Sequence, residues 1–304
     1  MGSMVHPVNE KWSGRWAALA ASVLVVAIAG LVGSPAAAAA GETNDYAGTA
    51  GLLGLGTSAR LLALGGAGVA AVADGTAIFY NPAALVRVGG TQLSSMYATQ
   101  FDVADYLSVG AASGGWGAGL VQLGSAGNEY RDSFGNPTGV FDLSESVVVV
   151  GGARQAGAVA IGVAAKYYRQ NLPGVKGWGL TADAGVLLTQ GPVSLAAVVR
   201  NAAGTVVYDN GVSDRFDSEY VFGMAWRHGN LLWVGDFQAP NTLRGGVELT
   251  SGRLMLRLGG WSGRGSSAVT AGLGVVSGNL AVDYALQLEA YLPVSHRFSA
   301  GIRF

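Results

Sequence analysis

LAVDYALQLE, residues 280–289, alternates apolar side chains with small or polar ones along its whole length. Successive side chains of a β-strand point to opposite faces, so this stretch predicts a strand with one apolar face and one polar face. Asp283, Gln287 and Glu289 would lie together on the polar face. Such a strand separates an apolar environment from an aqueous one.

The same alternation recurs upstream and downstream of this stretch. Leu254, Leu256 and Leu258 alternate with Arg253, Met255 and Arg257, and the final residues to Phe304 repeat the pattern, with His296 as a polar exception. Runs bounded by Gly, Pro, Asn or Asp predict about fourteen strands. They lie near residues 90–101, 105–113, 116–123, 141–154, 157–168, 178–190, 192–202, 219–227, 230–239, 242–250, 253–262, 266–276, 279–289 and 295–304.

The connections between these strands alternate in length. Tight turns are predicted at 114–115, 155–156, 191, 228–229, 251–252 and 277–278, with longer connections at 124–140, 169–177, 203–218 and 290–294 between them. Short connections at 102–104 and 240–241 break the rule. Bacterial outer-membrane barrels have short periplasmic turns and longer outer loops, whereas a soluble β-sandwich, which also alternates, has no reason to keep this parity.

Composition also favours a membrane protein. Of 304 residues 49 are Gly, only 12% are charged, and mean hydropathy is +0.36, yet after residue 41 no apolar run reaches the roughly 18 residues of a spanning helix. Strands cross a bilayer only as a closed barrel, because an open sheet would leave unpaired amides in hydrocarbon. The prediction is an all-β membrane β-barrel of about fourteen antiparallel strands over residues 89–304, with outer-membrane lipid around it.

The first forty residues read as a secretory signal peptide. Lys11 and Arg15 precede an apolar run over 16–32, and small residues follow to Ala40. Cleavage near Ala40 would release a mature chain to the bacterial outer membrane. An uncleaved anchor helix is the alternative, although the run is slightly short for spanning.

Residues 41–88 break the strand pattern. The string GTSARLLALGGAGVAAVADGTAIFYNPAAL, residues 56–85, has small-residue spacing that suggests short, closely packed helical turns. Pro82 fixes its own φ and forces Asn81 out of helical geometry, which ends one such turn. We predict a small N-terminal helical plug that fills the barrel lumen.

This string resembles the N-terminal plug of the PorV/PorQ branch of the FadL-like outer-membrane proteins. The motif residues are Arg60, Gly65, Gly66, Asp74, Asn81 and Pro82, followed directly by the first barrel strand. The resemblance implies a fourteen-stranded barrel and either transport or, as in some PorV-like members, partnership with secretion-system proteins. FadL-type fatty-acid transporters carry apolar outer loops that catch a lipid, whereas loops 124–140 and 203–218 are polar in this chain.

Other chemistry finds little support in the sequence. The net charge of −1 offers no basic field for nucleic acid, and the absence of Cys removes thiolate chemistry and disulfides. Only His6, His228 and His296 are present, so neither a Ser-His hydrolase nor a metal site is expected. The glycine string at 51–56 lacks the Gly-Lys-Ser/Thr of a phosphate loop. We therefore expect no enzyme activity and no cofactor.

Charged residues collect on the polar parity of the strands, which would face the lumen. We single out seven candidates there: Asp236, Arg244, Glu248, Arg257, Asp283, Arg297 and Arg303. Charges in a narrow lumen must be paired, so mutual salt bridges and bonds to the plug are the more ordinary interpretation, and a polar path is the functional one. Arg60 and Asp74 of the plug would be natural partners for opposite wall charges.

Two functional hypotheses remain open at this point. The first is a plugged FadL-like channel or transporter for small molecules, hydrophobic ones included, because a barrel of this size is too wide for side chains alone to fill. The second is a PorV-like secretion or surface-assembly partner that binds protein. A purely structural barrel and a soluble secreted β-protein are the remaining alternatives.

Overall fold

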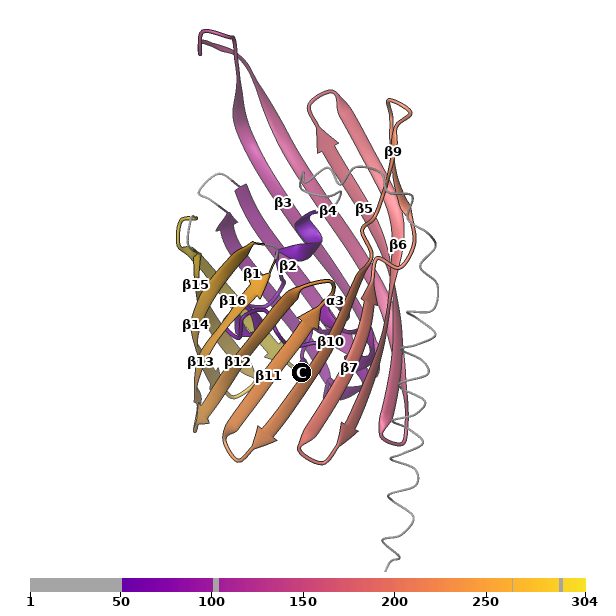
Figure 1. Ribbon diagram of the computed structural model, residues 1–304, viewed down its shortest axis with the longest axis vertical. Coiled ribbons are helices and arrows are strands. Elements are labelled where there is room, and N and C mark those ends of the chain that lie inside the picture. The colour runs from indigo at the N-terminus through magenta and orange to yellow at the C-terminus, as the bar shows by residue number, and fades with distance from the viewer. Residues whose placement is uncertain (1–50, 101–103, 264, 290–291) are drawn as a thin grey trace, which may run out of the picture. The chain divides into compact units, whose positions relative to one another are not determined.

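The computed structural model describes residues 51–100, 104–263, 265–289 and 292–304, with the side chains of Leu53 and Gln100 excepted (Figure 1). The predicted signal peptide, residues 1–40, lies outside the described residues. The described chain is almost entirely antiparallel strand, preceded by a short helical segment.

The helical segment comprises four short helices between residues 51 and 87. They are η2 (Gly51–Gly54), α2 (Ala59–Leu62), α3 (Ala77–Tyr80) and η3 (Pro82–Arg87). Ser58 caps α2 by accepting a hydrogen bond from the Leu61 amide, and Asn81 caps η3 by accepting one from the Ala83 amide. Pro82 occupies the first turn of η3, where its missing N–H is not needed. We call residues 51–88 the plug.

Fourteen long strands form one closed ring. They are β1 (Thr91–Gln100), β2 (Ala104–Ser113), β3 (Trp116–Arg131), β4 (Pro137–Ala156), β5 (Val159–Leu172), β6 (Val175–Gln190), β7 (Val193–Arg200), β10 (Glu219–His228), β11 (Leu231–Gln238), β12 (Thr242–Ser251), β13 (Leu254–Gly263), β14 (Ser266–Ser277), β15 (Leu280–Glu289) and β16 (Ser295–Arg303). Each pairs antiparallel with its neighbours, and β1 pairs with β16, which closes the ring. The predicted fold class is confirmed.

Six two-residue turns lie together at one end of the barrel, which we call the turn end. They occupy residues 114–115, 157–158, 191–192, 229–230, 252–253 and 278–279, each beginning with glycine. The first glycine of each has φ between 57° and 60°, the left-handed value that tight hairpin turns with the strand's own twist require. Four of the six turns lie one or two residues later than predicted, and in three of these four the glycine opens the turn where the prediction had it close the turn.

The opposite end, the loop end, differs from the sequence prediction in three places. The predicted loops 124–140 and 169–177 are mostly strand: β3 and β4 run on to a turn at 132–136, and β5 and β6 to a turn at 173–174 (Figure 1). Where both faces of a hairpin meet water, backbone pairing no longer needs apolar alternation. Polar sequence therefore suggested a loop where the chain forms strand.

The predicted polar loop 203–218 also contains strand. β8 (Thr205–Tyr208) continues along β6 beyond the last residue of β7, and β9 (Ser213–Arg215) pairs with β8. These two short strands were not predicted. They extend the barrel wall on the β6 side at the loop end.

The strands present the two faces that the alternation predicts. Leu254, Leu256 and Leu258 of β13 are 57%, 52% and 62% exposed on the outside, whereas Arg257 between them is 2% exposed. The core of the described chain lies inside the ring. It is built around Leu61, Leu64, Ile78 and Leu85 of the plug, all with no exposed surface.

Glycines in the barrel wall allow the plug backbone to contact the wall backbone. A Cβ on Gly246 or Gly259 would overlap the backbone of Leu64, so at these positions strand backbone and plug backbone touch directly. Glycine inside a strand commonly marks such a close approach of another backbone. The plug is thus a fitted part of the barrel interior.

Candidate functional site: the lumen and its plug

A chain of charges joins the plug to the wall. Arg60 of α2 donates from Nε and Nη2 to the two oxygens of Glu248 on β12, at 2.8 and 3.0 Å. Arg257 on β13 donates to the same Glu248 carboxylate at 2.8 Å and to Asp283 on β15 at 2.7 Å. Two arginines and two carboxylates therefore neutralise one another, which offsets the cost of burying them.

The electrostatics of Arg60 follow from this arrangement. Burial by itself lowers the pKa of the Arg60 guanidinium, but the Glu248 carboxylate more than offsets this and raises the pKa above its ordinary value. Arg60 therefore stays charged at every pH that the protein meets. The contact between plug and wall does not titrate away through this arginine.

Asp236 on β11 holds the second part of the plug. Its Oδ2 accepts hydrogen bonds from the backbone amides of Gly68 and Val69, at 2.7 and 3.2 Å. Its Oδ1 is buried with no hydrogen-bond partner among the described residues. A carboxylate on two adjacent amides fixes the direction of the plug backbone, which a neutral side chain would do less strongly.

The two motif glycines form the turn after α2. Gly65 and Gly66 have φ of 74° and 77°, a region that L side chains rarely adopt. The Gly65 amide donates to Thr270 Oγ1 at 3.0 Å, and a Cβ on Gly65 would overlap the backbone of Gly260 in β13. This turn is the point where the plug is pressed against the wall.

Asn81 and Pro82 serve the internal structure of the plug. The Asn81 side chain donates to the Val69 carbonyl at 2.9 Å and accepts from the Ala83 amide at 3.0 Å. Pro82 faces Gly162 of β5, where a side chain would collide with it. These residues shape the plug from within and line neither of the two cavities beside it.

Asp74 differs from the sequence interpretation. Its Oδ1 accepts from the amide and the hydroxyl of Thr76, at 2.9 and 2.5 Å, within its own turn. It forms no ion pair with a wall residue in the described part of the chain. Arg303, the expected kind of partner, lines the same cavity as Asp74, and Arg297 is buried in the wall at 5% exposure.

Arg87 was not singled out from the sequence, yet it holds the last turn of the plug. It donates to the Ala70 carbonyl at 2.7 Å, to Ser194 on β7 at 2.5 Å and to Thr189 on β6. In the sequence, the sign of this role is that Arg87 is an isolated cation shortly before the first strand. Its partners are neutral, so charge pairing gave no reason to select it.

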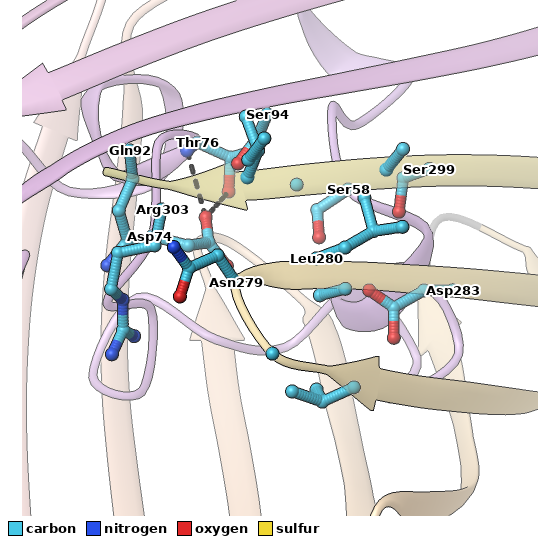
Figure 2. Close-up of a pocket in the computed structure, with 16 residues that line it drawn as sticks. Ser58, Asp74, Thr76, Gln92, Ser94, Asn279, Leu280, Asp283, Ser299 and Arg303 are labelled. Carbon is cyan, nitrogen blue, oxygen red and sulfur yellow. Dashed lines mark hydrogen bonds between the residues drawn. The ribbon is translucent and has the colours of Figure 1, made fainter.

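Two cavities lie on either side of the plug. The turn-end cavity, about 200 Å³, is lined by polar side chains of the plug and of β1, β15 and β16, and Figure 2 shows Asp74, Asn279 and Arg303 around it. Ser58, Gln92, Ser94 and Ser299 add hydroxyl and amide groups to its lining. Val276, Leu280 and Ile302 add apolar surface, so this cavity also has a mixed lining.

The loop-end cavity is larger, about 300 Å³, and has a mixed lining. Leu62, Phe79, Tyr80 and Trp261 give it apolar surface, while Arg200, Glu219 and Arg244 give it charge. A concave apolar surface with a few convergent polar groups is the usual make-up of a small-molecule site.

The plug backbone divides the two cavities. Thr57 lines the loop-end cavity and its neighbour Ser58 lines the turn-end cavity. A molecule crossing the lumen along this line meets the start of α2 and the charge chain at Arg60. These residues separate the two cavities.

In the described ranges no group of three or more His, Asp or Glu side chains is arranged to hold a metal ion. The described helices are all too short or too polar to cross a membrane.

A closed fourteen-stranded barrel with a helical plug defines this protein as having the fold of plugged outer-membrane β-barrels. The toluene transporter TbuX of Ralstonia pickettii superposes with a TM-score of 0.57 at 14% identity, covering 82% of this chain and 98% of its own. The P. putida toluene transporter TodX gives 0.59 at 12% identity, over 82% and 99%. A FadL homologue of Pseudomonas aeruginosa gives 0.53 at 12%, over 82% and 99%.

At these identities the likeness is one of fold. It agrees with the FadL-like barrel implied by the plug motif, while the PorV/PorQ branch remains a sequence-based prediction. No protein-family model and no curated protein matches the sequence.

Proposed function

We propose that this protein is an outer-membrane channel that lets small molecules, hydrophobic ones included, cross through the barrel lumen past the plug. The observation that carries the proposal is the pair of cavities divided by two adjacent plug residues, Thr57 and Ser58. A modest shift of the start of α2 would join the two cavities. The fold shared with toluene transporters supports the same class of cargo.

The barrier in this proposal is a held plug rather than an empty pore. Arg60 ties α2 to the wall through Glu248, so passage requires this contact to loosen or the backbone beside it to move. The lumen is otherwise filled by plug residues with no exposed surface, such as Leu61 and Leu64. Conduction would therefore be selective and slow compared with that of an open porin.

An uptake assay tests the proposal. Radiolabelled toluene uptake would be compared in cells that lack their own channels, with and without the full chain, and with Arg60→Ala. The intact chain should raise uptake and Arg60→Ala should raise it further, whereas Arg131→Ala at the exposed β3–β4 turn should match the intact chain. Uptake that stays at background for toluene and for small polar solutes alike would refute the channel.

Export and location belong to the same proposal. Residues 1–40 would act as a cleaved signal peptide, and the turn end would face the periplasm because short turns do so in bacterial barrels. Amino-terminal sequencing of the protein from the outer-membrane fraction should start close to Gly41. A start at Met1 in that fraction would refute cleavage.

One observation favours a second candidate, a protein-binding role. The β3–β4 hairpin projects beyond its neighbours and carries exposed apolar side chains, with Phe134 88% and Val140 73% exposed (Figure 1). Envelope proteins crosslinked to the intact chain but not to a chain lacking the hairpin tip would support this role. Identical crosslinking patterns would count against it.

A further inference from the structure

The loop-end cavity contains an arginine that no carboxylate neutralises directly. Arg244 of β12 is half-buried, and among the described residues it forms no ion pair. Its one polar contact there is a 3.3 Å hydrogen bond from Nη2 to Gln238 Oε1. Its guanidinium carbon lies 5.8 Å from the centre of the Trp261 ring.

Three other charged side chains line the same cavity: Asp236, Arg200 and Glu219. Asp236 is the register partner of Arg244 across β11 and β12; its Oδ2 accepts from the amides of Gly68 and Val69, and its Oδ1 has no hydrogen-bond partner among the described residues. Arg200 contacts Glu219 at 3.5 Å and the Tyr80 carbonyl at 3.2 Å. Arg244 is therefore the positive group of the cavity that is best placed to receive an anion.

The rest of the lining specifies what that anion would carry. Phe79 and Tyr80 from the plug, and Trp261 from β13, present ring surface to the same space. At about 300 Å³ the cavity is at the lower end of the range for small-molecule sites, which suits one ring better than an extended chain. Guanidinium recognises a carboxylate through two parallel N–H donors.

We propose that the loop-end cavity is a binding site for single-ring carboxylates, with the carboxylate on Arg244 and the ring beside Trp261 and Phe79. The inference deepens the proposed function, since it names an anionic class of cargo for the same lumen. It needs only that the cavity be accessible from the loop end, and it does not need the plug to move.

Equilibrium binding to the purified full chain in detergent tests the site. Benzoate, its neutral counterpart benzamide and the ringless carboxylate acetate would be compared by isothermal titration calorimetry. Benzoate should bind at least about tenfold more tightly than either, because benzamide lacks the charge and acetate lacks the ring. Equal affinity for benzoate and benzamide would overturn the proposal, and so would the absence of benzoate binding.

Variants locate the binding. Arg244→Gln should weaken benzoate by about ten- to a hundredfold, the usual effect of removing one charge-assisted partner, and leave benzamide nearly unchanged. Trp261→Leu should weaken both ring compounds. Arg227→Gln, an exposed arginine at the turn end of β10, is the matched control and should bind benzoate like the intact chain. Heat-modifiable gel mobility of each variant establishes that the barrel has folded.

The two proposals fail separately. If benzoate binding depends on Arg244 but the chain shows no uptake activity, the binding site is supported and the channel proposal is refuted. If the chain takes up toluene but binds benzoate no better than benzamide, the channel is supported and the anion site is refuted. A folded Arg244→Gln variant with unchanged affinity for benzoate would also refute the anion site.

Discussion

At the scale of single residues, Glu248 connects the plug to two strands of the wall. It receives Arg60 from the plug and Arg257 from the next strand, and its side chain is 4% exposed. Glu248 and Asp283 together thus compensate the charges of the two guanidinium groups. The consequence is that its loss leaves buried positive charge behind, which costs more than the contact itself contributes.

We expect Glu248→Ala to lower the free energy of unfolding by about 3–5 kcal/mol, the usual cost of breaking a buried ion pair from one side. Urea unfolding of the barrel in lipid vesicles measures it. Glu129→Ala removes the partner of Arg131 in an exposed pair and should cost less than about 1 kcal/mol. Equal effects of the two substitutions would show that the charge chain does not hold the plug.

Gly65→Ala should loosen the plug without unfolding the barrel. The left-handed conformation costs an L residue about 1–2 kcal/mol, and the new Cβ would also overlap Gly260 of the wall. Trypsin should then cleave after Arg60 or Arg87 in the folded barrel, as detected by mass spectrometry. Gly89→Ala, which meets no atom within 4 Å, is the control and should stay as resistant as the intact chain. Resistance of both variants would refute the role of Gly65.

At the scale of elements, the β3–β4 hairpin consists of two parts. Up to Gly124 the strand β3 pairs with β2 as well as β4, and β4 pairs with β5 from Ser144 onward. Beyond these points the two strands pair only with each other, with a bulge between Ser125 and Asn128. A two-stranded ribbon is only marginally stable by itself, so this part depends on the barrel and the barrel does not depend on it.

Replacing residues 126–142 by an Asn-Gly turn should leave the barrel folded, because Ser125 and Leu143 are register partners that such a turn can join. A longer cut that joins Gly119 to Val149 shortens the wall where β3 pairs with β2, and it should prevent folding. Heat-modifiable mobility of both variants gives the comparison. Failure of the shorter variant to fold would mean that the hairpin tip is needed for assembly.

At the scale of the whole described chain, stability rests on closure. β1 and β16 are the first and last long strands of the chain, and their pairing leaves none of the fourteen long strands at a free sheet edge. The turn-end glycines set the hairpins in register one after another, and the plug fills the interior. Removing the last strand would expose two edges to lipid, where unpaired amides cannot be solvated.

Truncation after Leu292 removes β16 and should abolish the compact form of the protein on unboiled SDS gels. The intact chain should migrate differently before and after boiling, as closed barrels do. A chain lacking only the turn 132–136 should keep this behaviour. A truncated chain that remains heat-modifiable would mean that the barrel closes without β16.

Local patterns in the sequence specify the fourteen long strands and the two faces of the wall, because period-two alternation and turn glycines are local properties. The sequence did not reveal the strand extensions at the loop end, because a hairpin whose two faces both meet water lacks the alternation of apolar and polar residues. Nor did it show that Arg60 meets Glu248, 188 residues away, while Asp74 turns to Thr76. Those choices, and the division of the lumen between Thr57 and Ser58, depend on how ring closure places distant strands around the plug. Only the tertiary structure decides them, because no local pattern records which wall residues come to face it.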